Sequence, residues 1–174
     1  MAEPGLALPD GADAATRYAR VHAVALAVLD GEPNPVARMA TVSCLLAAAF
    51  PDNVWTGFYL VDAHSPRQLV VGPYQGSLGC LRIGFGQGVC GTCAETGVVQ
   101  VVPDVRAFAG HIACDARSRS EIVVPVRDAT GRLLAVLDVD SPHEATFDET
   151  DAGALQALVD AVFAVPPVRG SGTG

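Results

Sequence analysis

Long runs of apolar residues at helical spacing occur only near the two ends of this chain, and short strand-like runs fill the stretch between them. The pattern predicts long helices over residues 13–29, 36–50 and 148–165, and a short one over 89–96. It predicts strands over 55–61, 68–72, 81–85 and 98–102, and a hairpin that pairs 121–126 with 133–140. A parallel doubly wound sheet would need strands and helices to alternate throughout. The order therefore predicts an α+β fold in which helices flank a central antiparallel sheet.

The 174 residues suit one domain, which we expect to span 13–165 between a flexible N-terminus (1–12) and a disordered tail (166–174). The formal net charge is −8 and the chain has no lysine, which argues against nucleic acid or an anionic membrane as a partner. The longest apolar stretches are too short to cross a bilayer, and the first residues lack the pattern of a signal peptide. These features favour a cytoplasmic protein, in which any disulfide would be transient and catalytic.

Three cysteines, Cys80, Cys90 and Cys114, lie in glycine-rich or polar loop sequence. A cysteine kept for packing behaves as a small hydrophobe and usually lies inside an apolar run. Cys90 falls at the start of the predicted short helix, where unpaired N–H groups and the helix dipole favour a thiolate. Cys114 is followed closely by Arg117 and Arg119, whose charges lower a thiol pKa. These contexts indicate redox chemistry by cysteine, with buried packing as the alternative.

The remaining two cysteines carry weaker signals. Cys93 forms a Cys-x-x-Cys pair with Cys90, which alone is weak support for a redox motif. Cys80, Cys90, Cys93 and Cys114 could also supply four sulfur ligands to zinc, but the second half of such a site lacks a paired knuckle, so we expect no metal. Cys44 lies in an alanine-rich predicted helix and is expected in the core.

Carboxylates gather at the predicted hairpin. Asp138 and Asp140 end its second strand, and their spacing places both on one face with Leu134 and Val136. Glu121 opens the first strand, so the hairpin can bring it near the two aspartates. Clustered carboxylates at an apolar rim can hold a ligand ammonium, and mutual repulsion can keep one of them protonated as a general acid. The alternative is a solvated strand end beside a turn.

Trp55, Gly57 and Tyr59 share one face of the first predicted strand. Two large rings separated by a glycine would leave a slot between them, suited to a small ligand with a methyl or cationic group. Core packing is the commoner role of such a pair. The polar segment 104–120 is long for a compact domain, which makes it a candidate functional loop.

Several motifs, in this order along the chain, resemble the free methionine-(R)-sulfoxide reductases, which are stand-alone GAF-domain enzymes. They are WTGFYL (55–60), GQGVCGT (86–92), VVPDV (101–105), GHIACD (110–115), SRSEIVVPV (118–126) and VLDVDSP (136–142). The resemblance implies a single GAF-like catalytic domain. It also implies an enzyme that reduces the R epimer of free methionine sulfoxide to methionine, through a cysteine sulfenic acid and an intramolecular disulfide.

The resemblance assigns roles to three of the five cysteines. It makes Cys114 the nucleophile, and it makes Cys80 and Cys90 the resolving or relay thiols. Cys93 departs from the family pattern, in which a small residue such as alanine is expected, so the order of the resolving step stays open. The resemblance further implies NADPH-linked thioredoxin as the external reductant, no bound cofactor and a homodimer.

The same resemblance assigns the substrate site. Its acids match Glu121, Asp138 and Asp140, and its aromatic walls around the methyl-sulfoxide end match Trp55 and Tyr59. Two other functions compete with the reductase. One is a non-catalytic GAF sensor that binds a small ligand, because the fold alone does not determine function. The other is a zinc- or redox-sensing thiol protein.

Overall fold

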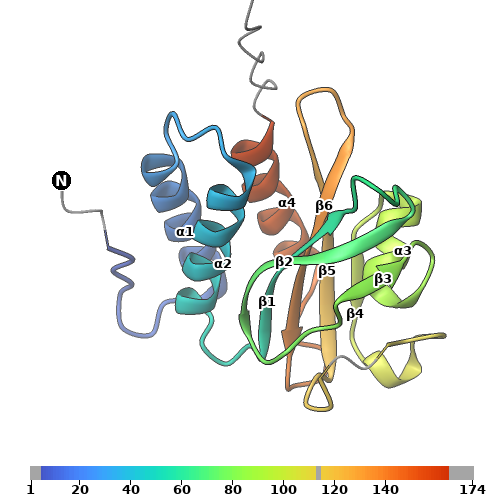
Figure 1. Cartoon of the computed structure of the whole chain (residues 1–174). Helices are drawn as coiled ribbons and strands as arrows, with labels where there is room; N and C mark the ends of the chain where they lie inside the picture. The colour runs from blue at the N-terminus through green and yellow to red at the C-terminus, as the bar shows by residue number, and fades with distance from the viewer. Residues whose placement is uncertain (1–4, 113–114, 165–174) are drawn as a thin grey trace, which may run out of the picture.

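The computed structural model describes residues 5–112 and 115–164, which form one α+β unit (Figure 1). Its helices are α1 (Ala14–Val28), α2 (Pro35–Ala49), α3 (Gly88–Thr96), α4 (Glu149–Phe163) and the short 3₁₀ helix η1 (Val105–Ala107). Its strands are β1 (Trp55–Val61), β2 (Gln68–Gly76), β3 (Arg82–Gly84), β4 (Gln100–Val102), β5 (Ser120–Arg127) and β6 (Leu133–Ser141). The predicted elements are all present within a few residues of their expected ends.

Local chemistry accounts for where the helices begin and end. The Asp13 side chain accepts a hydrogen bond of 2.8 Å from Thr16 N at the start of α1. Asn34 caps α2 in the same way, and Asp148 forms a capping box with Asp151 at the start of α4. Gly97 ends α3 in the left-handed conformation at φ 67°, as the sequence predicts.

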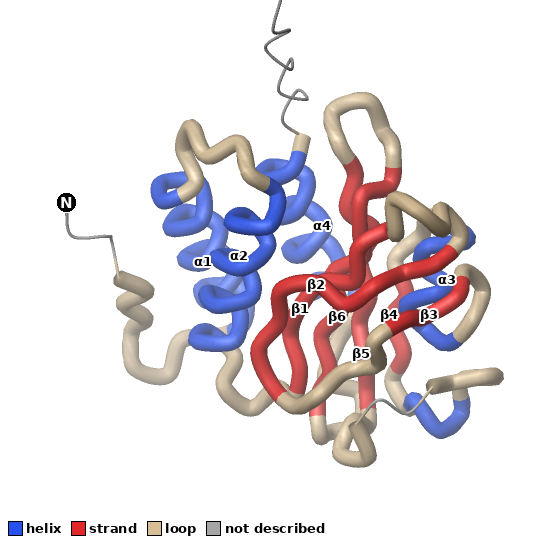
Figure 2. Tube along the Cα trace, viewed as in Figure 1, coloured by secondary structure: helices blue, strands red, loops and turns tan. Residues whose placement is uncertain are grey.

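The six strands form one sheet in the order β3-β2-β1-β6-β5-β4, and all neighbours are antiparallel (Figure 2). The antiparallel prediction is therefore confirmed. Strand β2 continues to Gly76, four residues past the predicted end at Gly72. Its register against β1 shifts between Gly57 and Tyr59, so Pro73 lies at an irregularity where its missing N–H costs no ladder hydrogen bond.

The sheet separates two apolar clusters. Helices α1, α2 and α4 cover one face, where Phe58, Ile122 and Leu137 are fully buried. Helix α3 lies against the other face, whose cluster contains Trp55, Tyr59, Val123, Val136 and Cys90. The functional residues predicted from the strands therefore share the α3 face.

One predicted position on this face is wrong. Alternation along β6 places Leu134 beside Val136, but Leu134 packs against the opposite cluster. The register between β5 and β6 shifts at this point, because Val126 pairs with Ala135 and Arg127 with Leu133. Leu134 is the extra residue of this bulge, and a bulge breaks the alternation of side chains.

Residues near the N-terminal end of the described chain also touch the core: Leu6 and Leu8 pack against the cluster beneath α1, α2 and α4. Across residues 5–112 and 115–164, the helices are too short or too polar to span a lipid bilayer.

Candidate active site

Cross-strand pairing brings the three predicted acids together. On neighbouring strands, Glu121 of β5 lies directly opposite Asp140 of β6, and Asp140 lies opposite Trp55 of β1. Asp138 lies one row further along the same face, opposite Val123. All three carboxyl groups are buried, with 5 to 8% of each residue exposed. The predicted cluster is confirmed, and the alternative of a solvated strand end is excluded.

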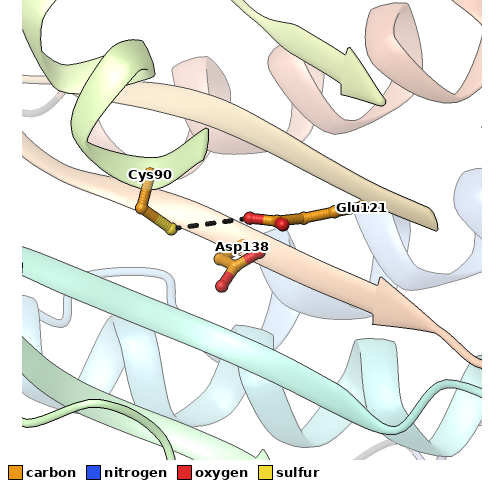
Figure 3. A group of neighbouring side chains, drawn as sticks. All are labelled: Cys90, Glu121 and Asp138. Carbon is orange, nitrogen blue, oxygen red and sulfur yellow. Dashed lines mark hydrogen bonds between the residues drawn. The ribbon is translucent and has the colours of Figure 1, made fainter. Parts of the chain in front are cut away.

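Helix α3 brings a thiol into this cluster because its first turn approaches the sheet closely. A Cβ on Gly91 would lie 2.2 Å from the carbonyl oxygen of Gly84, so only glycine permits this distance. Cys90 is the third residue of α3, and its Sγ donates a hydrogen bond to Glu121 Oε1 at 3.9 Å (Figure 3). Asp138 lies beside both groups, and donor atoms of the three side chains lie within 4.8 Å of one another.

Burial controls protonation here. It raises the pKa of Glu121, Asp138 and Asp140 well above the ordinary carboxyl range, and repulsion among the three carboxylates raises it further. The raised pKa values favour the protonated form of these acids, which can donate a proton. Burial, followed by repulsion from Asp138 and Glu121, also raises the pKa of Cys90. The prediction of a favoured thiolate at Cys90 is thus wrong, because desolvation and buried acids outweigh the short helix N-terminus.

The long polar segment completes the site. His111 Nε2 lies 3.6 Å from Glu121 Oε2, and burial lowers the pKa of this histidine. Ser118 is buried beside Asp140, and its hydroxyl partly offsets the rise of the Asp140 pKa. These residues, together with Cys90 and the acids, line a cavity of about 20 Å³. The predicted loop thus contributes residues to the cavity. Ser118 lies in the quoted motif SRSEIVVPV, but nothing in the sequence singles it out from that motif, because its burial depends on the fold.

The predicted slot between Trp55 and Tyr59 is absent. The two rings stack on each other, with centroids 5.2 Å apart and planes inclined by 17°. Tyr74 stacks on Trp55 from β2, at a centroid distance of 5.3 Å, and its Cβ occupies the space above Gly57. Among the described residues that line the cavity, neither Trp55 nor Tyr59 is present. Burial, followed by the negative charge of Asp138, raises the pKa of Tyr59. Among the residues that the structure describes, the indole N–H of Trp55 is buried without a hydrogen-bond partner.

The described cysteines differ in their burial and in the groups that they contact. Cys80 is half-buried and packs against the same cluster as Cys90. Cys93 is fully buried, and its Sγ donates to the backbone oxygen of Val123 at 3.6 Å, outside the group formed by Cys90, Glu121 and Asp138. Cys44 is exposed on α2, so the prediction that it belongs to the core is wrong. Cys114, the predicted nucleophile, lies outside the described residues.

A curled antiparallel sheet with one helix-covered face, and a buried thiol among carboxylic acids on the other, defines a small-molecule site on a GAF-type scaffold. A family model described as a GAF domain matches residues 12–163. The free methionine-R-sulfoxide reductase of Saccharomyces cerevisiae is 42% identical over 133 residues, covering 74% of each chain. The Escherichia coli protein of the same name is 43% identical over 133 residues, covering 76% of this chain and 78% of its own.

Solved structures give the same result. The free methionine-R-sulfoxide reductase from Neisseria meningitidis, in complex with its substrate, superposes with a TM-score of 0.84 at 45% identity, and the match covers 91% of this chain and 93% of that one. The reduced form of the Staphylococcus aureus protein superposes with a TM-score of 0.78 at 39% identity, covering 83% and 92% of the two chains. The chain belongs to the GAF-domain family and, within it, to the free methionine-R-sulfoxide reductases.

Proposed function

We propose that this chain reduces the R epimer of free methionine sulfoxide to methionine. The supporting observation is the buried cluster of Glu121, Asp138 and Asp140 beside the Cys90 thiol, in a chain that belongs to this family of reductases. A protonated acid can give its proton to the sulfoxide oxygen, and an ionised one can hold the substrate ammonium. Both forms are available in one cluster whose members repel each other's charge.

The redox step that we propose uses two thiols. The Cys114 thiolate attacks the sulfoxide sulfur while an acid protonates the oxygen, the S–O bond breaks, and methionine leaves as the oxygen passes to Cys114 as a sulfenic acid. A second thiol, Cys80 or Cys90, then attacks the sulfenic sulfur, so that water leaves and a disulfide forms. Thioredoxin returns both thiols by exchange and is itself oxidised.

A coupled assay tests this function. Purified protein is supplied with thioredoxin, thioredoxin reductase and NADPH, and it receives either the R or the S epimer of free methionine sulfoxide. We expect NADPH oxidation with the R epimer alone, loss of turnover in Cys114→Ser, and a decrease of at least about 100-fold in Asp138→Asn. Cys93→Ala is the matched control, because this thiol bonds to the backbone of Val123 rather than to an acid and should be dispensable. Turnover that survives in Cys114→Ser would refute the assignment of the nucleophile.

Three further properties belong to the same proposal. We expect thioredoxin to be the external reductant, with no bound cofactor, and a cytoplasmic location. We also expect a homodimer, so light scattering after gel filtration should give twice the chain mass of 17.9 kDa. A mass of one chain across the working concentration range would contradict the dimer and leave the chemistry unaffected.

A further inference from the structure

We propose that Cys90, Glu121 and Asp138 form a binding site for one Zn²⁺ ion, and that zinc bound there inhibits the reductase. The inhibitory part rests on the proposed function, whereas the binding site itself does not. The first observation is geometric, because the three donor atoms lie within 4.8 Å of one another and converge from α3, β5 and β6 (Figure 3). In a tetrahedral zinc site, neighbouring ligand atoms lie about 3.5 Å apart. The distance of 3.9 Å between Cys90 Sγ and Glu121 Oε1 is close to that value.

A second and independent observation is an orphaned oxygen. Asp138 is 5% exposed, and its Oδ1 is buried without a hydrogen-bond partner among the residues that the structure describes, although it belongs to the cluster. A buried carboxylate oxygen without a partner is costly unless a cation or a donor satisfies it. Among the residues that the structure describes, His111 is the sole ion-pair partner of the acids in this cluster. A cation bound by Asp138 would satisfy this oxygen.

The donor set selects the kind of cation. Mg²⁺ and Ca²⁺ prefer oxygen ligands alone, whereas a thiolate together with carboxylates suits Zn²⁺. This site differs from the four-sulfur site considered from the sequence, since Cys93 points to Val123 instead.

The space available agrees with an ion. The cavity holds about 20 Å³, which is enough for one water-sized particle. Zinc in this position would occupy the carboxylates that hold the substrate and would tie up the Cys90 thiol. Inhibition should therefore be competitive with methionine sulfoxide and reversed by a chelator.

Metal binding can be measured without the enzyme assay. Protein reduced with a phosphine, which does not compete for metal as a dithiol does, is titrated with Co²⁺ and then with Zn²⁺. We expect one equivalent of Co²⁺ to give a near-ultraviolet cobalt–thiolate charge-transfer band together with strong visible bands typical of tetrahedral cobalt, and Zn²⁺ to abolish both. Cys90→Ser should remove the charge-transfer band. Glu121→Gln and Asp138→Asn should each weaken binding by at least about 10-fold.

Two controls make the result decisive. Cys93→Ala should bind metal as the wild-type chain does, because its thiol lies outside the cluster, and circular dichroism confirms that each variant is folded. If Cys90→Ser does not fold, the two carboxyl variants decide the question. Metal affinity that is unchanged in Glu121→Gln and Asp138→Asn, or a band lost in Cys80→Ser with Cys90 intact, would overturn the proposed site in favour of binding by thiols alone.

The inhibitory part needs an assay free of thioredoxin, whose own thiols bind zinc. A single turnover of the reduced enzyme, followed as methionine formed per chain, should be blocked by one equivalent of Zn²⁺ and restored by a chelator. Metal binding without any turnover would refute the proposed function and leave the site standing. Turnover that is unaffected by saturating zinc would refute the proposed inhibition. Turnover in a chain that binds neither Co²⁺ nor Zn²⁺ would overturn both the binding site and the inhibition.

Discussion

Replacing Asp138 by asparagine should stabilise this protein at neutral pH while it destroys activity. Asp138 is 5% exposed, one of its oxygens has no hydrogen-bond partner, and burial followed by the charge of Glu121 raises its pKa well above the ordinary value of 3.8. Asparagine has nearly the same shape and stays neutral, so the variant avoids the cost that the carboxyl group imposes. Functional groups in active sites often lower the stability of the protein, so replacing one of them commonly stabilises it.

The sign and size of the effect follow from proton linkage. The unfolded chain releases the Asp138 proton near its ordinary pKa, whereas the folded protein keeps the proton to a higher pH. The folded state therefore binds more protons in this interval, so the free energy of unfolding falls as the pH rises, by about 1.4 kcal/mol per pH unit for each retained proton. Over the pH range in which the folded protein keeps this proton, Asp138→Asn should therefore gain stability over the wild-type chain as the pH rises.

Urea unfolding followed by circular dichroism, with a reductant and a chelator present, measures this difference at each pH. Asp128→Asn is the control. Hydrogen bonding to Thr130 and neighbouring groups lowers the pKa of Asp128 to about 2, so its contribution should be constant between pH 5 and pH 7. If Asp138→Asn and the wild-type chain show the same pH dependence in this range, Asp138 does not retain its proton and the reasoning about the cluster is wrong.

Three further predictions concern other parts of the chain. Gly91→Ala should lower stability by about 1 to 3 kcal/mol and reduce turnover, because the added Cβ would lie 2.2 Å from Gly84 O and displace α3. Gly153→Ala is the control, since the space around this glycine is open, and it should be neutral or stabilising in the same urea titration. Cys93→Ala should cost about 1 kcal/mol of stability and leave kcat unchanged, and a large fall in kcat would instead make Cys93 part of the redox relay. Arg38→Met should lower the free energy of unfolding by about 2 kcal/mol and leave KM unchanged, because the buried guanidinium donates a hydrogen bond to Val162 O on α4. A change in KM would instead link this distant contact to the site.

Sequence patterns predicted the fold and the acid cluster well because both depend on local periodicity. The turn between β5 and β6 determines the hairpin register, and that register alone places Glu121 opposite Asp140. The motif resemblance predicted the family. These predictions required no knowledge of how distant segments pack.

The errors concern contacts that form only when distant segments meet. The slot between Trp55 and Tyr59 is filled because Tyr74 arrives from β2 and the rings stack. The protonation of Cys90 could not be predicted either, because the sequence does not show that α3 points this thiol at Glu121. Leu134 lies on the opposite face of the sheet from the predicted one, because a bulge interrupts the alternation of side chains along β6.

The two faces of the sheet differ in what a protein engineer can change. On the face covered by α1, α2 and α4, side chains such as Phe58, Ile122 and Leu137 are packed without a buried carboxyl group among them. The opposite face holds its acids at a cost in stability. Thermostable versions of this enzyme should therefore come from substitutions in the three-helix layer, while specificity for a different sulfoxide should be sought on the α3 side. Because the sheet lies between them, the two sets of changes should combine almost additively.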